Sequence, residues 1–424
     1  MKEAKKTTWD LVVIGGGPSG MMAAGRAAEL GASVLLIEKN EILGKKLLIT
    51  GGGRCNLTNA EFDTRKFLSK FKENDKFLFS PFSKFGVKES IDFFEDKGMP
   101  TKVEEENRVF PKSNSARSVW NILVQYMKKN NVTILSNSPV SGFLRKDEKI
   151  TSVKLKNGDI IKGKYFVLAT GGKSRPETGS TGEGFSWLKM LGHTITQPNP
   201  ALVPVATSDK WVAKLKGVSL GKAGVNIFQN DEKHSSREGK VLFTHFGLSG
   251  PAILNSSKDI GELLKYGEVV VSLDLFPKLN QKELDMKVQE AFKKYINKKF
   301  KNSLVNMLPD ALAEAVIKFS GIDKETPCHS ISKEERKKLV QTLKGLEIKV
   351  ERLLSVKKAI VTSGGIDLKE VDFKTMSSKI YSNIYLVGDV LNIDRPSGGY
   401  SLQICWTTGY VAGTDIGEKI KSTD

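Results

Sequence analysis

Three glycines near the beginning of the chain have the spacing of a dinucleotide-binding turn. Gly15, Gly17 and Gly20 form a G-x-G-x-x-G sequence, and Glu38 follows roughly 20 residues later. In such a turn one glycine makes the bend, one lets the backbone approach a pyrophosphate, and one lets the helix pack closely on the strand. A carboxylate at the position of Glu38 accepts hydrogen bonds from ribose hydroxyl groups and repels a 2′-phosphate. The spacing therefore predicts a site for a dinucleotide with an unmodified ribose.

A second candidate for chemistry is His245, which lies in a segment flanked by glycine and serine. Because an imidazole titrates near neutral pH, His245 is a candidate general acid or base. The alternative is a histidine that only stabilises a turn. His193 follows a predicted helix end and is expected to be structural. The sequence shows no cluster of His, Cys and carboxylate residues with metal-ligand spacing and no Gly-x-Ser-x-Gly elbow, so neither a metal site nor that kind of hydrolase is expected.

The glycine turn needs a strand before it and a helix after it. Residues 11–14 are a short apolar run typical of a buried parallel strand, residues 21–30 are an alanine-rich helix, and residues 33–37 form the next strand. Further strands are expected at residues 131–135, 165–169 and 384–387, and a last helix runs from Gly399 to about Ile420. Both ends of the chain, residues 1–196 and 359–424, are therefore predicted to form one nucleotide-binding α/β domain.

The middle of the chain is then an insertion. Residues 197–279 and 347–358 have the short alternating runs of a small β-barrel domain, and residues 280–346 are predicted to be a helical insertion. One helix of this insertion carries an apolar stripe and many lysines. Its basic face is compatible with a nucleic acid, with a membrane surface, or simply with solvent around a packed helix.

Composition limits the function classes further. The chain has 424 residues and a formal net charge of +18, which either attracts polyanions and anionic substrates or reflects a lysine-rich solvated surface. No apolar run approaches the roughly 20 residues that span a bilayer, so no membrane span is expected. Three distant cysteines form no disulfide framework, and we expect a cytoplasmic protein. The oligomeric state stays open.

Several motifs resemble those of a known family. The sequence from Gly44 to Asn59, with its Gly-Gly-Gly-Arg-Cys-Asn core, resembles the signature loop of a bacterial BaiN/RdsA-like family of NAD(P)/FAD-dependent flavoproteins. Members include dehydro-bile-acid reductases and proteins called aminoacetone oxidases. The similarity continues, in the family's order, at residues 108–111, 169–172, 179–184, 242–251, 361–365, 388–389 and 398–403.

The resemblance implies a glutathione-reductase-like FAD-binding Rossmann domain of the α/β class, with an inserted β-barrel plus helical domain. In it, Arg54 is expected to offset phosphate charge, Asn56 to bond the flavin edge, and Val140 to face adenine. N–H groups at the start of the last helix would favour reduced flavin. Asp389 and Ser401 stand where many relatives have glutamate and asparagine. With the glycine motif, the implied FAD-binding residues are Gly15, Gly17, Ser19, Gly20, Glu38, Lys39, Gly53, Arg54, Cys55, Asn56, Val140, Ala169, Thr170, Gly171, Gly388, Asp389, Gly399, Tyr400, Ser401 and Leu402.

The expected activity is therefore an FAD-dependent oxidoreductase that transfers hydride between flavin and a small organic substrate, with His245 or Tyr400 handling a proton. Only one complete G-x-G-x-x-G is present, so NAD(P)H would dock transiently at the flavin face. Enone reduction and amine oxidation both stay open. A small-molecule substrate is expected rather than a nucleic acid; the alternatives are a tRNA-modifying flavoprotein and a non-catalytic flavin-binding module.

Overall fold

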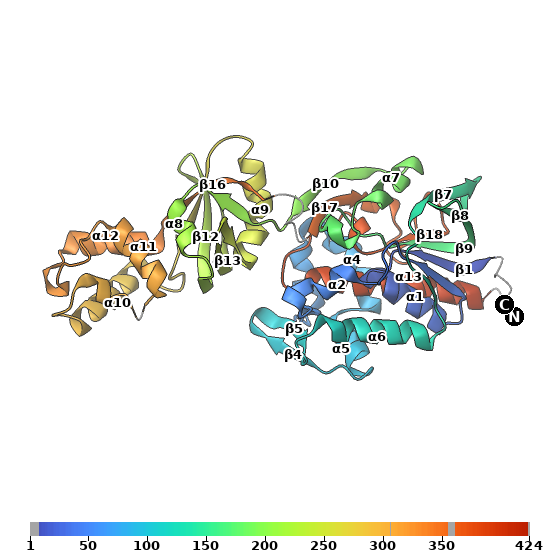
Figure 1. The fold of residues 1–424 in the computed structure, drawn as a ribbon, viewed down its shortest axis with the longest axis horizontal. Coiled ribbons are helices and arrows are strands. Elements are labelled where there is room, and N and C mark those ends of the chain that lie inside the picture. The colour runs from blue at the N-terminus through green and yellow to red at the C-terminus, as the bar shows by residue number, and fades with distance from the viewer. Residues whose placement is uncertain (1–7, 306, 355–360, 423–424) are drawn as a thin grey trace. The chain divides into compact units, whose positions relative to one another are not determined.

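The computed structural model describes residues 8–305, 307–354 and 361–422 (Figure 1). By its internal contacts the chain divides into two compact units. Unit 1 holds residues 1–200 and 360–424, and unit 2 holds residues 201–359. Both ends of the chain therefore belong to the same unit.

Unit 1 is built on a seven-stranded sheet with β1 at its centre. β1 (Trp9–Ile14) lies between β2 (Val34–Ile37) and β9 (Ile160–Leu168), and the three strands run parallel. β1 and β2 are largely buried, as parallel strands covered on both faces are. The other strands are β6 (Thr133–Leu135) beside β2, β18 (Ile384–Leu386) beside β9, and the antiparallel hairpin β7 (Val140–Lys146) and β8 (Lys149–Leu155), of which β8 pairs with β9.

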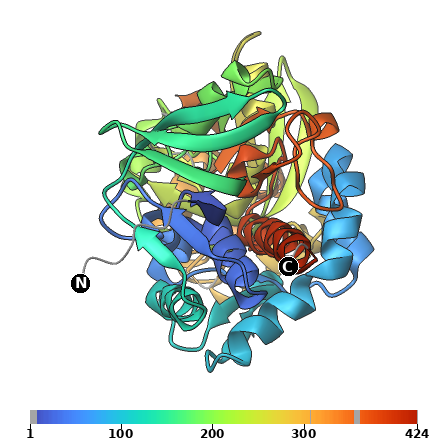
Figure 2. The same cartoon turned by 90° about the vertical axis from the view of Figure 1, so that its right-hand side faces the viewer.

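The first and last helices of the chain pack directly against each other. α1 (Pro18–Glu29) and α13 (Tyr400–Lys421) lie side by side in both views of the ribbon (Figures 1 and 2). A Cβ atom on Gly409 or Gly413 of α13 would lie only 2.4 Å or 2.6 Å from a backbone oxygen of α1, so these glycines permit the close approach. α6 (Ala116–Lys129) also packs on α1. The two ends of the chain thus belong to the same compact unit.

Shorter elements complete unit 1. Their aromatic side chains extend the core of unit 1, with Phe67, Phe71 and Phe94 almost fully buried. Most of these elements lie in residues 60–115, for which no element was predicted. They are α2 (Lys45–Leu48), α3 (Thr64–Leu68), α4 (Asp75–Lys84), α5 (Val87–Glu95), α7 (Glu183–Met190) and a three-stranded antiparallel sheet of β3 (Thr58–Asn59), β5 (Arg108–Pro111) and β4 (Thr101–Glu104).

Unit 2 combines a closed barrel with a helical region. The barrel interior is filled by aliphatic side chains such as Val225, Ile227 and Val271, all fully buried. The barrel order is β11 (Val205–Thr207), β14 (Gly247–Ser249), β13 (Glu232–Thr244), β12 (Ser219–Gln229), β15 (Val269–Asp274) and β16 (Leu346–Leu353), with α8 (Lys210–Lys214) and α9 (Pro251–Leu263) beside it. The helices α10 (Gln281–Lys294), α11 (Asp310–Ser320) and α12 (Lys333–Lys344) lie between β15 and β16 in sequence.

The boundary between the units differs slightly from the prediction. The insertion was expected to begin at Gln197, but unit 1 extends to Pro200. The reason is that β10 (Ile195–Ala201) pairs with β17 (Val361–Ile366) in a two-stranded sheet, which holds most of β10 in unit 1. The second expected boundary, at residues 358 and 359, lies outside the described residues.

Candidate functional site

A pocket in unit 1 opens where β1, β2 and β9 end. It brings together residues from distant parts of the chain, including the turn after β1, the end of β2 and the segment after β9. Parallel sheets commonly bind ligands at the carboxyl ends of their strands. Ten of the predicted cofactor-binding residues line this pocket: Gly15, Gly17, Ser19, Glu38, Lys39, Val140, Ala169, Thr170, Gly171 and Asp389.

The three glycines of the motif have different surroundings. Gly15 has a φ of +105°, and a Cβ atom there would lie 2.5 Å from the oxygen of Ala169. A Cβ on Gly20 would lie 2.0 Å from the oxygen of Gly15, so Gly20 allows α1 to sit against the strand end. Gly17 is different, because the nearest atom to its Cβ would be the oxygen of Ala169 at 3.9 Å. A side chain on Gly17 would therefore enter the pocket rather than the protein.

The carboxylate of Glu38 is held in place at the end of β2. One of its oxygens accepts a hydrogen bond from the backbone N–H of Gly16 (2.8 Å), and the other accepts from the backbone (2.8 Å) and side chain (2.7 Å) of Asn40. Glu38 is buried and lines the pocket. The motif turn and the acid that follows it are thus joined directly, and the oxygen bonded to Gly16 retains capacity to accept one further hydrogen bond.

The beginning of α1 offers an anion site. Gly17 is its N-cap, no side chain caps it, and Pro18 occupies the first turn. The first N–H groups of a helix lack partners within the helix and carry its positive dipole end. Pro18 has no N–H, but Gly17 and Ser19 line the pocket, so the N–H groups from Ser19 onward are available to a diphosphate.

A buried charge cluster forms another wall of the site. Asp389 accepts hydrogen bonds from Arg395 (2.9 Å) and Lys46 (3.3 Å), and Lys46 also donates to Ser174 (2.7 Å). Burial opposes ionisation of Asp389, but the two cations prevail and lower its pKa. Two cations facing one carboxylate leave an excess of positive charge, which suits a diphosphate. Asp389 was predicted from the family resemblance, whereas Lys46 and Arg395 were not.

One polar atom of the pocket has no protein partner. The Thr170 hydroxyl is buried and makes no hydrogen bond among the described residues. Thr170 lines the same pocket as the open side of Gly17. An unpartnered hydroxyl, a glycine with space beside it, a helix N-terminus and a fixed carboxylate together fit a dinucleotide such as FAD.

The segment at residues 178–183, which follows β9, is joined to the end of β2 by hydrogen bonds. Lys39 donates to Glu183 (2.6 Å) and Thr181 (2.8 Å), and Asn40 donates to the backbone oxygen of Thr178 (3.1 Å). All five residues line the pocket. Burial opposes ionisation of Glu183, but the ion pair with Lys39 prevails and lowers the pKa of Glu183. The predicted residue Lys39 therefore contacts protein groups here.

The first residues of the signature loop, Gly44, Lys45 and Lys46, line this pocket, whereas its Gly-Gly-Gly-Arg-Cys-Asn core does not. Arg54 forms an ion pair with Glu104 (2.5 Å) and lies over the ring of Phe110 (4.2 Å). With its amide oriented so that both ends bond, Asn56 accepts from the N–H of Gly399 (3.0 Å). The side chains expected to reach FAD are thus engaged within the protein in this structure.

Cys55 and Gly53 belong to the same loop. Cys55 is fully buried as a free thiol, and burial raises its pKa to about 12. A protonated buried thiol is a poor nucleophile. A Cβ on Gly53 would meet no atom within 4 Å, so this part of the loop has open space beside it.

The remaining predicted residues lie near the beginning of α13. A Cβ on Gly399 would lie 2.3 Å from the backbone of Thr58, so this glycine permits a close crossing of the signature loop. Tyr400 packs against Phe67 with ring centroids 4.8 Å apart, and burial raises the pKa of Tyr400 to about 12. Gly388, Gly399, Tyr400, Ser401 and Leu402 lie outside the lining of the nucleotide pocket, as does Gly20.

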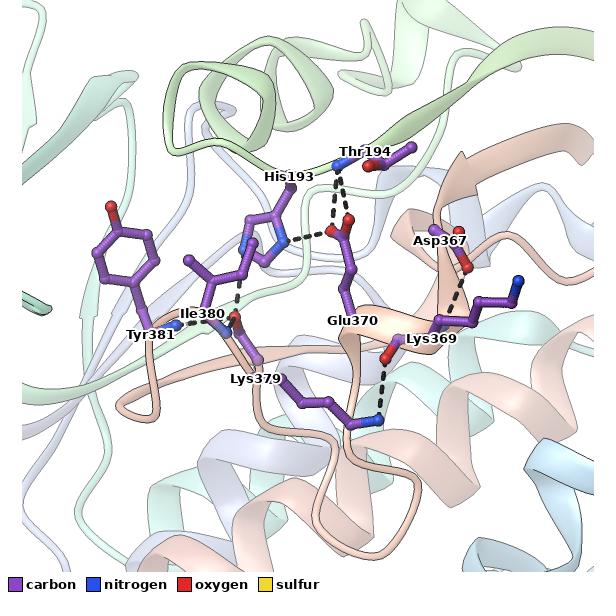
Figure 3. A network of polar contacts seen from close by, with 9 residues as sticks. His193, Thr194, Asp367, Lys369, Glu370, Lys379, Ile380 and Tyr381 are labelled. Atoms are coloured by element: carbon purple, nitrogen blue, oxygen red, sulfur yellow. Dashed lines mark hydrogen bonds and ion pairs between the residues drawn. The ribbon is translucent and has the colours of Figure 1, made fainter.

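The histidines differ in setting. His245 belongs to unit 2, in the exposed turn between β13 and β14, with its ring against Phe246 (4.9 Å). Its acid–base role stays a prediction. His193 in unit 1 is buried between Glu370 (2.9 Å) and Ser378 (3.2 Å) (Figure 3). Burial lowers the pKa of His193, although the carboxylate of Glu370 acts in the opposite direction. The hydroxyl oxygen of Ser378 already accepts hydrogen bonds from two backbone N–H groups.

The described residues contain no group of three or more His, Cys, Asp or Glu side chains that could hold a metal ion. None of the helices they form is both long and apolar enough to cross a membrane.

Comparison with known proteins identifies relatives along almost the whole chain. A 3-dehydro-bile acid delta(4,6)-reductase from Clostridium scindens is 30% identical over 414 residues, covering 96% of this chain and 98% of that protein. A ribosomal RNA dihydrouridine synthase from Haemophilus influenzae is 31% identical over 411 residues, with the same coverage of 96% and 98%. The solved 3-ketosteroid delta1-dehydrogenase of Sterolibacterium denitrificans has a TM-score of 0.56 at 14% identity, covering 98% of this chain and 100% of that one, which shows a shared fold.

A family model described as the HI0933-like protein Rossmann domain matches residues 9–415. The predicted family resemblance, fold class and enzyme class, an oxidoreductase flavoprotein, are confirmed. The chain belongs to the HI0933-like Rossmann family.

Proposed function

We propose that this protein binds FAD in the pocket of unit 1 and transfers hydride between the flavin and an organic substrate whose carbon–carbon double bond is conjugated with a carbonyl group. The pocket itself is the observation that supports the FAD-binding part of this proposal. The open side of Gly17, the fixed carboxylate of Glu38 and the unpartnered hydroxyl of Thr170 meet there.

Several groups around the pocket would each bind a different part of the dinucleotide. The N–H groups at the start of α1 would bind the diphosphate, and the positive cluster of Lys46 and Arg395 would offset its charge. Glu38 would accept hydrogen bonds from a ribose. Asp389, kept ionised by its two cations, would accept from a hydroxyl group. Bound FAD would supply a carrier of two electrons and a proton.

The substrate class follows from the chemistry in the relatives' names. Saturating a 3-oxo-4,6-diene and converting uridine to dihydrouridine are the same kind of step. A hydride adds to the carbon remote from the carbonyl, and a proton adds to the neighbouring carbon. NAD(P)H is the proposed source of the hydride. Amine oxidation, the other activity open from the sequence, finds no support in these names.

Proton transfer needs a residue near the reacting carbons. Tyr400 is protonated at neutral pH, as a free tyrosine is, and burial raises its pKa further, to about 12, so it can donate a hydrogen bond to a carbonyl oxygen. His245 is exposed, and its imidazole is the proposed proton donor from unit 2.

Anaerobic mixing tests this proposal. FAD-loaded protein is mixed with NADH or NADPH and then with a 3-oxo-4-ene steroid or with uridine, and the oxidised protein is mixed separately with aminoacetone, while flavin absorbance is followed. Bleaching by a nicotinamide and reoxidation by an enone or uridine is the expected result. Bleaching by aminoacetone, without reoxidation by any enone, would contradict the enone proposal and favour amine oxidation.

A second candidate substrate is uridine within RNA. The relative named a ribosomal RNA dihydrouridine synthase matches 96% of this chain, and the formal net charge is +18. The same flavin chemistry would serve this substrate. Mass spectrometry of ribosomal RNA and tRNA after incubation with FAD-loaded protein and NADPH would detect dihydrouridine in one, both or neither.

A further inference from the structure

The end of α10 and the loops beyond it carry a dense group of lysines. Five lysines occur between residues 293 and 301, and Lys324 joins them from a second loop. All six side chains are exposed. We call this group the basic surface of unit 2: Lys293, Lys294, Lys298, Lys299, Lys301 and Lys324.

The two loops are held together by their backbones. Phe300 donates to the oxygen of Thr326 (2.8 Å), Lys301 to that of Lys324 (3.1 Å), and Cys328 to that of Lys298 (3.0 Å). Phe300 and Cys328 are buried, so the loops are anchored in the core of unit 2. The lysines therefore project from a fixed backbone rather than from a flexible arm.

Little negative charge opposes this surface. Glu325 pairs with Lys299 (2.5 Å) and Lys301 (2.7 Å), whose hydrogen bonds lower its pKa to about 2. Across the described residues, Lys293, Lys294 and Lys298 form no ion pair. Lysines in the last turn of α10 offset the helix dipole, but that explains only the first two members of the surface.

We propose that the basic surface of unit 2 is a docking surface for the phosphodiester backbone of RNA. Lysines bind phosphates without regard to sequence and orient a polynucleotide for a separate reaction site. Ile296, half exposed among these lysines, adds an apolar group for a ribose or base. A membrane-binding helix would need an exposed apolar face, whereas the apolar residues of α10, such as Leu284 and Val288, are buried. The proposal rests on the second candidate substrate above.

The test compares two triple variants of the full-length protein. K293E/K294E/K298E reverses three charges of the basic surface. K128E/K129E/K146E reverses three exposed lysines of unit 1, two of them likewise in the last turn of a helix, and gives the same change of net charge. Binding of a fluorescein-labelled RNA hairpin is measured by anisotropy from about 50 to about 200 mM salt. Circular dichroism and bound flavin check that each variant is folded.

The wild-type protein and the unit 1 variant should bind the hairpin with similar affinity and a steep salt dependence. The unit 2 variant should bind at least about tenfold more weakly, with a salt slope lower by about three, since each lost phosphate contact lowers it by about one. Equal loss in both variants, unchanged binding in the unit 2 variant, or stronger binding to phosphatidylserine vesicles than to RNA would overturn the proposal. Because RNA binding requires no hydride transfer, flavin bleaching by NADPH tests the proposed activity separately.

Discussion

Replacing Gly17 with valine should weaken cofactor binding while leaving the protein folded. Gly17 is the N-cap of α1 with φ −76° and ψ 179°, a backbone conformation that valine also adopts. The nearest atom to a Cβ at this position is 3.9 Å away, so the protein accommodates the new side chain. The added methyl groups would occupy the pocket where a pyrophosphate is proposed to lie.

The effects of Gly17→Val on folding and on FAD binding have different expected magnitudes. A poor N-cap residue costs about 1 kcal/mol of unfolding free energy, which leaves Gly17→Val folded. Overpacking against the ligand costs about 1–3 kcal/mol or more of binding free energy, a loss of about fivefold to more than a hundredfold in FAD affinity. Gly20→Val is the matched control. Its Cβ would lie 2.0 Å from the oxygen of Gly15, so it should destabilise the protein itself.

Two measurements distinguish the variants. Thermal unfolding of the apoproteins should place Gly17→Val close to wild type and Gly20→Val well below it. Flavin absorbance after gel filtration should then show little bound FAD in Gly17→Val. A folded Gly17→Val protein with full flavin content would refute the assignment of this pocket.

Three further expectations follow from named contacts. Glu38→Ala should weaken FAD binding by about 1.5–3 kcal/mol in a fluorescence titration, because ribose loses its acceptor; unchanged affinity would remove Glu38 from the site. His245→Ala should keep its flavin but slow turnover by about 10²–10⁴-fold, and wild-type turnover would leave His245 structural. Partial burial opposes ionisation of Asp10, yet bonds from Lys164 and Ser33 lower its pKa from 3.8 to about 2. Asp10 should therefore stabilise the fold above pH 4 and cease to do so as the pH falls toward 2; Asp10→Asn should flatten that part of a pH–stability curve.

Local patterns predicted the centre of the fold correctly. A short apolar run, spaced glycines and an acid at a strand end are all encoded within residues 11–38, and they come together as expected. The last helix was likewise expected, from Gly399 to about Ile420, and α13 spans Tyr400–Lys421. The structure adds what such patterns do not contain, namely the aromatic side chains through which α3, α4 and α5 join the core of unit 1.

Side-chain pairing was harder to predict because its partners are far apart in sequence. Lys46 reaches Asp389 across 343 positions, and no local signal marks it as part of the pocket. Arg54 and Asn56 were expected at the cofactor from the family resemblance, yet Arg54 pairs with Glu104 and Asn56 bonds the N–H of Gly399. Such contacts depend on the fold as a whole, so a motif alone does not reveal them.

Calorimetric titration of the full-length apoprotein with FAD and with FMN tests the central claim most directly. The proposed site holds the adenosine half of the dinucleotide through Glu38 and the diphosphate through α1. We therefore predict one FAD bound per chain and far weaker binding of FMN, which lacks the adenosine. Failure to bind FAD, or equal affinity for the two flavins, would contradict the account.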